Sequence, residues 1–222
     1  MSFAPATIAA VRRETPGART ITLDVDDWPG HIAGQHVDVR LTAENGYTAV
    51  RSYSIATSAG SLLLEITVDR LVDGEVSPYL VDVAEVGARV EVRGPSTGWF
   101  VWRGDSDGPV QLIGGGSGVV PLMAMVRSHG NAGSAAPFRL LHSVRTLASA
   151  LFYDELKQRA ASDRHLTADY AFSRETSPGW PGAPARLNQT AIEASIFAPS
   201  ERATFFVCGS TPFVEAVAAV AD

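Results

Sequence analysis

The first hundred residues alternate between apolar and polar positions in short runs, which is the pattern of half-buried β-strands. Turn-forming pairs such as Pro16-Gly17 and Asn45-Gly46 separate the runs, and Asn-Gly favours a hairpin because both residues tolerate positive φ. Short antiparallel strands remove their exposed edges by closing on themselves, so we expect a six-stranded antiparallel Greek-key β-barrel. Its strands are predicted at residues Ala6–Arg12, Thr20–Val25, His36–Leu41, Val50–Ile55, Leu62–Val68 and Arg89–Val92.

A short helix is expected to interrupt the strands at Tyr79–Val83. Ser77 before it has the side chain of an N-cap, and Pro78 suits a first helical position.

The pattern changes after about residue 105, where apolar runs alternate with longer periodic segments. Strands are predicted at Val110–Ile113, Arg139–Val144, Leu166–Phe172 and Thr204–Val207. Helices are predicted at Val119–His129, Ala148–Ala160, Thr190–Ile196 and Pro212–Val220. This alternation implies an α/β domain with a parallel sheet covered on both faces. The polar Gly104–Pro109 segment is the expected linker, so we predict a barrel domain at 1–105 and an α/β domain at 106–222.

Composition narrows the possible functions. No apolar run in the 222 residues approaches the ~20 needed to span a bilayer. A net charge of -6 without a Lys/Arg cluster argues against nucleic acid as the main ligand. Cys208 is the single cysteine, which excludes an internal disulfide and an iron–sulfur cluster built on about four thiolates. A reducing cytoplasm fits, and the scattered histidines show no metal-ligand spacing, so no metal site is expected.

Two short motifs carry candidate chemistry. Arg51-Ser52-Tyr53-Ser54 ends a predicted strand, and Gly114-Gly115-Gly116-Ser117-Gly118-Val119-Val120-Pro121 joins a strand to a helix. Glycines at such a turn let backbone N–H groups approach a diphosphate, and the helix N-terminus adds a positive dipole. A glycine-rich turn can equally be a tight connection without a ligand. Its spacing is not G-x-G-x-x-G, so an ordinary Rossmann dehydrogenase is not the best match.

In this order the motifs resemble the flavin site and the pyridine-nucleotide site of the ferredoxin–NADP reductase (FNR) superfamily. The second motif resembles the G-G-x-G-x-x-P element of that superfamily. The resemblance covers nearly the whole chain and implies a single-chain FAD- and NAD(P)-binding oxidoreductase lacking an iron–sulfur domain. It implies an FAD-binding barrel followed by an NAD(P)-binding α/β domain.

For the flavin, the resemblance implies that Arg51 meets the diphosphate, Tyr53 stacks on the isoalloxazine and Ser54 lies near the reactive nitrogen. Strand alternation puts Arg51 and Tyr53 on one face and Ser54 on the other, unless the strand bends. The same four residues could also be an ordinary strand pattern.

A second flavin segment follows at 73–77, which resembles G-G-x-x-S with Asp73 in place of the first glycine. Since an aspartate repels phosphate, the resemblance assigns the contacts to Gly74, Val76 and Ser77. Residues 94–100 resemble G-P-x-G-x-F, with Thr97 replacing the second glycine.

For the nicotinamide cofactor, the resemblance places the diphosphate on the turn residues Gly115, Gly116, Ser117, Gly118 and Pro121. Four polar residues follow the second and third strands of this half, at the carboxyl ends where ligands bind: Ser143, Arg145, Ser173 and Arg174. Superfamily members that prefer NADPH put Ser and Arg there, and arginine suits a phosphate. We therefore expect NADPH, with NADH less favoured. Each arginine could also be a plain surface charge.

The segment Cys208-Gly209 resembles the C-G element near the nicotinamide. Its cysteine has a positioning role there, and a lone cysteine can also be a small apolar residue. The resemblance thus gives Tyr53, Ser54 and Cys208 as the residues nearest the chemistry.

The leading hypothesis is hydride transfer from NADPH to FAD, with electrons passing to a separate ferredoxin, flavodoxin or oxygenase component. One alternative is a flavin-binding relay or regulatory subunit without its own turnover. Another is a nucleotide-binding α/β enzyme whose barrel binds proteins.

The superfamily pattern continues beyond the last helix into a fifth parallel strand. Without such a strand, the sheet edge beside Thr204–Cys208 would be unpaired, a feature that native proteins usually cover. We therefore expect the natural chain to continue past Asp222.

Overall fold

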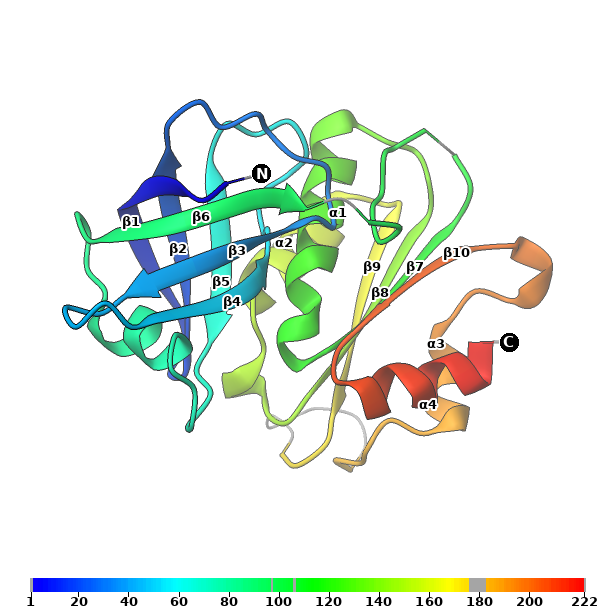
Figure 1. Cartoon of the computed structure of the whole chain (residues 1–222). Helices are drawn as coiled ribbons and strands as arrows, with labels where there is room; N and C mark the ends of the chain where they lie inside the picture. The colour runs from blue at the N-terminus through cyan, green and yellow to red at the C-terminus, as the bar shows by residue number, and fades with distance from the viewer. Residues whose placement is uncertain (1, 97, 106, 176–182, 222) are drawn as a thin grey trace. The chain divides into compact units, whose positions relative to one another are not determined.

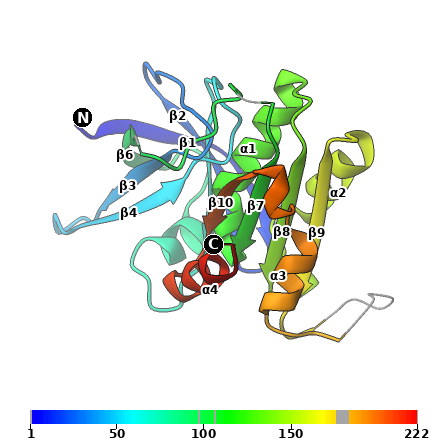
Figure 2. The same ribbon diagram turned by 90° about the vertical axis from the view of Figure 1, so that its right-hand side faces the viewer.

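The computed structural model describes residues 2–96, 98–105, 107–175 and 183–221. Two residues of predicted segments lie outside the described residues: Thr97, in the 94–100 segment that resembles G-P-x-G-x-F, and Ser106, in the predicted linker. The chain forms two compact units, which Figures 1 and 2 show from two directions. The first contains Met1–Arg103 with Met123–Arg127, and the second contains Gly104–Leu122 with Ser128–Asp222. The predicted domain boundary after residue 105 stays a prediction.

The first unit is the predicted antiparallel barrel. Its strands are β1 (Ala4–Thr15), β2 (Ala18–Val25), β3 (His36–Thr42), β4 (Thr48–Ser54), β5 (Leu64–Asp69) and β6 (Arg89–Ser96). They pair in the order β4-β3-β6-β1-β2-β5, and every pair is antiparallel. A bridge between Ile55 and Ile66 joins the two ends of this order. The sheet therefore closes on itself, as the strand count predicted.

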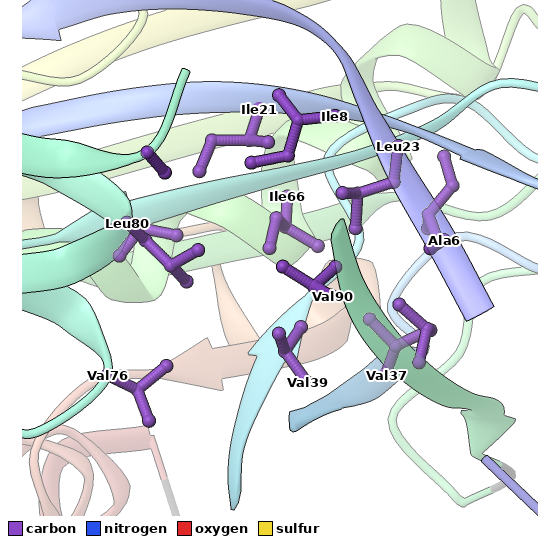
Figure 3. Close-up of a cluster of buried hydrophobic side chains, with 14 of the residues drawn as sticks. Ala6, Ile8, Ile21, Leu23, Val37, Val39, Ile66, Val76, Leu80 and Val90 are labelled. Carbon is purple, nitrogen blue, oxygen red and sulfur yellow. The ribbon is translucent and has the colours of Figure 1, made fainter. Parts of the chain in front are cut away.

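Apolar side chains from alternate strand positions fill the barrel (Figure 3). On β3, Val37 and Val39 are fully buried, while the residues that alternate with them, His36, Asp38 and Arg40, are only partly buried. Burying one such side chain stabilises the fold by about 1.5–3 kcal/mol. A short helix η1 (Tyr79–Val83) adds Leu80 and Val81 to the same core.

The N-cap prediction for Ser77 is wrong. The residue before η1 is Pro78, and η1 has no side-chain cap. The Ser77 hydroxyl instead accepts the backbone N–H of Leu71 at 3.0 Å. The serine is therefore used by the loop before the helix, where it satisfies a backbone donor.

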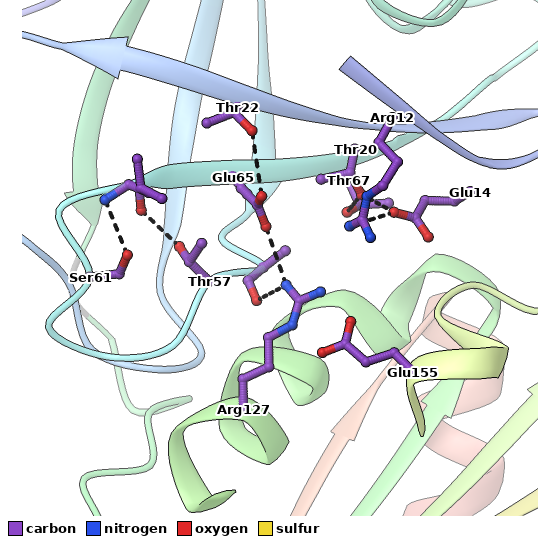
Figure 4. Close-up of polar contacts among 12 residues, drawn as sticks. Arg12, Glu14, Thr20, Thr22, Thr57, Ser61, Glu65, Thr67, Arg127 and Glu155 are labelled. Carbon is purple, nitrogen blue, oxygen red and sulfur yellow. Dashed lines mark hydrogen bonds and ion pairs between the residues drawn. The ribbon is translucent and has the colours of Figure 1, made fainter. Parts of the chain in front are cut away.

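Polar groups inside the first unit pair with one another (Figure 4). Thr20 Oγ1 donates to Glu14 at 2.6 Å, and the Thr67 hydroxyl lies 2.7 Å from the Thr20 hydroxyl. Arg127 Nη1 donates to the carbonyl of Ala56 at 2.8 Å. Because Ala56 comes two residues after β4, this bond holds the backbone that follows the Arg51–Ser54 motif.

The second unit contains the predicted parallel sheet. Its strands are β7 (Val110–Gly115), β8 (Phe138–Val144), β9 (Leu166–Phe172) and β10 (Thr204–Cys208). Their order is β10-β7-β8-β9, and every pair is parallel. The helices are α1 (Val119–Ala132), α2 (Tyr153–Ser162), α3 (Gln189–Ser195) and α4 (Thr211–Ala221), joined by the short turns η2 (Gly116–Gly118), η3 (Leu147–Ser149) and η4 (Pro199–Glu201).

Alternate residues of the central strands face helices on opposite sides of the sheet. Ile113 and Leu141 share a buried cluster with Ile192 of α3 and Val217 of α4. On the other side, Gly114 lies so close to α1 that a Cβ there would be 3.2 Å from the Leu122 side chain. The sheet is therefore covered on both faces, as its continuous apolar runs predicted.

One predicted helix is divided in the structure. The segment predicted as one helix at Ala148–Ala160 divides into η3 and α2, because Phe152 takes a left-handed conformation with φ of 57°. No helix within the described part of the chain is long and apolar enough to cross a membrane.

Candidate functional site

The barrel brings together the two segments predicted to hold the flavin diphosphate. Arg51 Nη2, on β4, donates to Glu75 Oε2 at 2.7 Å, and both side chains are about half exposed. Tyr47 donates its hydroxyl to the other Glu75 oxygen at 2.6 Å. The hydrogen bond from Tyr47 and the charge of Arg51 lower the pKa of Glu75, so its carboxylate is ionised at pH 7. A cation on β4 thus lies beside Gly74–Ser77.

The register of β4 decides which side chains of the Arg51–Ser54 motif share a face. Arg51 lies opposite Val39 and Tyr53 opposite Val37, and both valines are fully buried. Residues directly opposite each other share a face of the sheet, so Arg51 and Tyr53 share the face of these valines. Ser54 lies opposite His36 and belongs to the other face. This is the arrangement that strand alternation predicted.

Tyr53 is partly buried and packs against the barrel core. Burial raises the pKa of its phenol to about 12, although Arg51 nearby opposes this shift. The hydroxyl is therefore neutral at pH 7 and can donate a hydrogen bond. A neutral ring held by packing on one side is suited to stacking.

The segment before η1 is closely packed. Gly74 donates its N–H to the Leu71 carbonyl at 3.1 Å, and a Cβ at Gly74 would lie 2.8 Å from Ser77 Oγ. Val76 is fully buried and Ser77 is 5% exposed. The glycine is therefore required by packing within the loop, and Val76 can reach a ligand only through its backbone.

The glycines of the second motif divide into two groups. A Cβ at Gly118 would lie 2.2 Å from the Cys208 carbonyl oxygen, and one at Gly115 would lie 2.9 Å from the Phe213 ring. At Gly116, whose φ is 54°, no atom lies within 4 Å of such a Cβ. Gly116 and Ser117 are exposed. The open side of the turn is therefore at these two residues, and the other glycines allow close packing.

Pro121 lies in the first turn of α1, which begins at Val119. Its missing N–H is one that a first turn leaves unpaired, so the proline fits there as predicted.

The Cys208–Gly209 element lies directly beside this turn. Cys208 pairs with Gly114 in the parallel ladder, and a Cβ at Gly209 would lie 2.7 Å from the Phe213 ring. Burial raises the pKa of the Cys208 thiol, with a hydrogen bond from the Gly209 backbone opposing it. The thiol is protonated at pH 7, which suits packing against a ligand and not nucleophilic attack.

The predicted phosphate-binding residues gather at the same edge of the sheet. Ser143 pairs with Gly115 on one side and with Ala171 on the other, so the strand ends are level. Ser173, just beyond β9, donates its N–H to the Val144 carbonyl at 2.9 Å. The strand ends therefore align the four predicted polar residues along one row.

Arg145 and Arg174 come from different loops but lie side by side. The Arg174 N–H donates to the Arg145 carbonyl at 3.0 Å. Both residues are exposed, and neither guanidinium has an ion-pair partner within the described ranges. The two cations are thus available for an anionic ligand.

Sequence reasoning missed residues whose neighbours come from distant segments. Glu75 binds Arg51 and accepts a hydrogen bond from Tyr47. The Phe213 ring lies against Gly115 of the nucleotide turn and against Gly209. Glu75 could have been noticed from its place between Gly74 and Val76. No local pattern identifies Phe213, since an aromatic residue in the first turn of a helix is ordinary.

Comparison with known proteins shows which domains the chain contains. A model of the oxidoreductase FAD-binding domain matches residues 15–102, and a model of the oxidoreductase NAD-binding domain matches residues 112–219. The ferredoxin–NADP reductase B of Sorangium cellulosum is 32% identical over 180 residues, covering 80% of this chain and 72% of that protein. The chain belongs to the ferredoxin–NADP reductase superfamily.

Other similar proteins include the reductase subunit of a monooxygenase and a solved reductase structure. The reductase subunit of glycine betaine monooxygenase from Chromohalobacter salexigens is 33% identical over 187 residues, covering 83% of this chain and 50% of that protein. The chain spans about half the length of the first relatives it matches. A Neisseria gonorrhoeae ferredoxin–NADP⁺ reductase structure with bound FAD and NADP has a TM-score of 0.84 at 20% identity, covering 100% of this chain and 91% of that one. At 20% identity this similarity shows a shared fold and nothing about the activity of this chain.

FAD and a nicotinamide nucleotide are therefore the cofactors of this superfamily member. Its described residues fit both groups. Arg51 presents a half-exposed cation beside Gly74–Ser77. Gly116 leaves open space at a helix start, and Arg145 with Arg174 presents two exposed cations at the strand ends.

The two kinds of glycine in the turn should respond differently to alanine. We predict that Gly118→Ala destabilises the fold by about 3 kcal/mol, because a backbone carbonyl cannot rotate away from the new Cβ. Gly116→Ala should cost only about 1–2 kcal/mol, the strain of a left-handed residue. Urea unfolding of both variants measures the difference. An equal or larger loss for Gly116→Ala would contradict this division.

Proposed function

We propose that this chain transfers hydride from NADPH to FAD and passes the electrons to a separate protein. The acceptor that we propose is an oxygenase component, a ferredoxin or a flavodoxin. The proposal is supported by the order of the FAD-binding and NAD-binding domains and by the names of the relatives. These include reductase components of glycine betaine, methane and 3-ketosteroid-9-alpha monooxygenases.

Hydride transfer and the later release of single electrons are chemistry that the two cofactors supply when bound. The residues of the chain contribute binding and orientation. We assign Arg51 to the flavin diphosphate, with Glu75 and Tyr47 holding its guanidinium in place. Tyr53 supplies the stacking surface, and Ser54 supplies a hydroxyl for the reactive ring nitrogen. Gly74, Val76 and Ser77 add backbone contacts to the flavin phosphates.

For the nicotinamide cofactor, we assign the diphosphate to the turn of Gly115, Gly116, Ser117 and Gly118, followed by Pro121. Arg174 and Arg145, with Ser143 and Ser173, bind the 2′-phosphate that distinguishes NADPH from NADH. Cys208 and Gly209 pack beside the nicotinamide. The protonated state of the Cys208 thiol at pH 7 supports a packing role. We further propose that the protein works in the cytoplasm, where NADPH is regenerated.

A visible absorption spectrum of the purified protein tests the proposal directly. We expect a flavin spectrum that bleaches when NADPH is added without oxygen. A flavin spectrum that NADPH leaves unchanged would favour the relay or regulatory subunit. Absence of flavin, even after incubation with FAD, would favour a nucleotide-binding enzyme with a protein-binding barrel.

Removing the Tyr53 ring should weaken flavin retention. An aromatic platform contributes roughly 0.5–1.5 kcal/mol beyond its buried area, so Tyr53→Ala should lose at least about twofold to tenfold in FAD affinity. Tyr53→Phe, which keeps the ring, should retain flavin nearly as well as the wild type. FAD titration of the apoprotein measures both. Unchanged affinity and spectrum in Tyr53→Ala would contradict the assignment.

Arg174 should select NADPH over NADH. Removing one charge-assisted contact to phosphate costs about 1.5–3 kcal/mol, so Arg174→Ala should weaken NADPH binding roughly tenfold to a hundredfold and leave NADH binding unchanged. Arg145→Ala should show a smaller loss of the same kind. Stopped-flow flavin reduction with both nucleotides measures these effects.

Glu175→Gln is the matched control for these variants. Glu175 lies in the same turn and donates its N–H to the Arg145 carbonyl at 3.2 Å, but it carries the opposite charge. The Glu175→Gln substitution should therefore not weaken NADPH binding. Equal affinity and rate with NADH and NADPH in the wild type would refute the preference.

A further inference from the structure

Two histidines in the second unit are fully buried, and the proposed function uses neither. His142 lies on β8 and His129 near the end of α1, each with 0% exposure. Each places its ring Nε2 against a backbone carbonyl, His142 at 3.0 Å from Gly116 and His129 at 2.9 Å from Ala136. Only the partner of His142 belongs to the proposed nucleotide turn.

The bond between His142 and Gly116 has a defined direction. Burial lowers the pKa of His142 to about 4, so the ring is neutral at pH 7 and carries one N–H. A carbonyl oxygen can only accept, so the proton is on Nε2, which donates to Gly116. Nδ1 then carries the lone pair and has no hydrogen-bond partner among the described residues. The single donor of the ring is thus committed to the turn.

The Gly116 carbonyl is held from two sides. It also accepts the N–H of Val119 at the start of α1. In a trans peptide the N–H points opposite to the C=O, so the Ser117 N–H points away from the buried His142 ring. Both Gly116 and Ser117 are exposed. The Ser117 amide is therefore directed to the open side of the turn.

A glycine peptide in open surroundings is free to rotate unless something holds it. Gly116 has a φ of 54° and no neighbour within 4 Å of a Cβ, so sterics alone leave its peptide several orientations. Rotating the Gly116–Ser117 peptide would turn a carbonyl toward the open side, where it would repel an anion. The rotation would also leave the His142 N–H buried without a partner, which is costly.

We propose that His142 is a positioning residue for the nicotinamide cofactor: it fixes the Gly116–Ser117 peptide so that the Ser117 N–H faces the cofactor diphosphate. The inference rests on the proposed nucleotide site at Gly115–Gly118. His142 acts through the backbone and does not touch the cofactor. His142 should therefore increase the affinity for every ligand that carries the diphosphate and leave the affinity for ligands without it unchanged.

The test compares two ligands in the FAD-loaded protein. NADP⁺ carries the diphosphate, and 2′-AMP carries the 2′-phosphate without it. In His142→Phe, which keeps an aromatic ring but removes the donor, the Kd for NADP⁺ should rise about threefold to tenfold, the range for one lost hydrogen bond. The Kd for 2′-AMP should stay within twofold. If the wild type prefers NADH, NAD⁺ and AMP form the corresponding pair.

Two further variants separate positioning from folding. His142→Gln retains a donor near the position of Nε2 and should recover most of the NADP⁺ affinity. His129→Phe removes the other buried histidine, which contacts Ala136 and Asp163. It should lower the melting temperature without changing the Kd for either ligand. If His142→Phe does not fold, His142→Met, which also removes the donor, is compared with His129→Met, and the same selective loss of NADP⁺ affinity is expected in His142→Met alone.

Three results would overturn the inference. They are an unchanged NADP⁺ affinity in His142→Phe, an equal weakening of NADP⁺ and 2′-AMP, or the same loss of NADP⁺ affinity in His129→Phe. Each leaves the proposed function intact if NADPH still bleaches the wild-type flavin. A wild type that binds no nicotinamide nucleotide would instead overturn the proposed function, and this inference with it.

Discussion

The approach of Gly118 to the end of β10 governs the arrangement of the nucleotide half. A Cβ at this position would lie 2.2 Å from the Cys208 carbonyl oxygen and 2.8 Å from the Gly209 nitrogen. Two backbones approach so closely only because residue 118 has no side chain. The start of α1 and the end of β10 are thereby held together. The polar groups of the turn and the Cys208–Gly209 element meet at one edge of the sheet for this reason.

A single glycine-rich motif therefore serves two physical purposes. Gly115 and Gly118 give room to the Phe213 ring and to the Cys208 backbone, and both would be needed without any ligand. Gly116 is different, because its left-handed conformation opens the turn to solvent. The buried His142 ring and the Val119 amide hold the Gly116 carbonyl from inside. The close packing and the open side of the turn thus fall on different glycines of one motif.

In the barrel an ion pair orients the predicted flavin-binding arginine, whereas in the nucleotide half close backbone packing positions the turn. Arg51 and Glu75 are 24 positions apart in sequence, yet they form an ion pair of 2.7 Å beside Tyr47. Exposed pairs of this kind contribute little stability, typically below about 1 kcal/mol. Their value lies in orientation, since the pair holds a guanidinium beside the closely packed Gly74–Ser77 segment. A diphosphate bound there would meet an arginine that is already placed.

The sequence by itself determined the local elements and the order of the motifs. Alternation predicted the six barrel strands, the apolar runs predicted the parallel strands, and spacing along β4 predicted that Arg51 and Tyr53 share a face. These features depend on near neighbours in the chain. Only the tertiary structure decided that Ser77 bonds Leu71 instead of capping η1, that Phe152 divides a predicted helix, and that Phe213 and His142 support the nucleotide turn. Each of these outcomes is a competition between groups that folding brings together, and no local pattern records which partner a hydroxyl, a ring or a carbonyl will find.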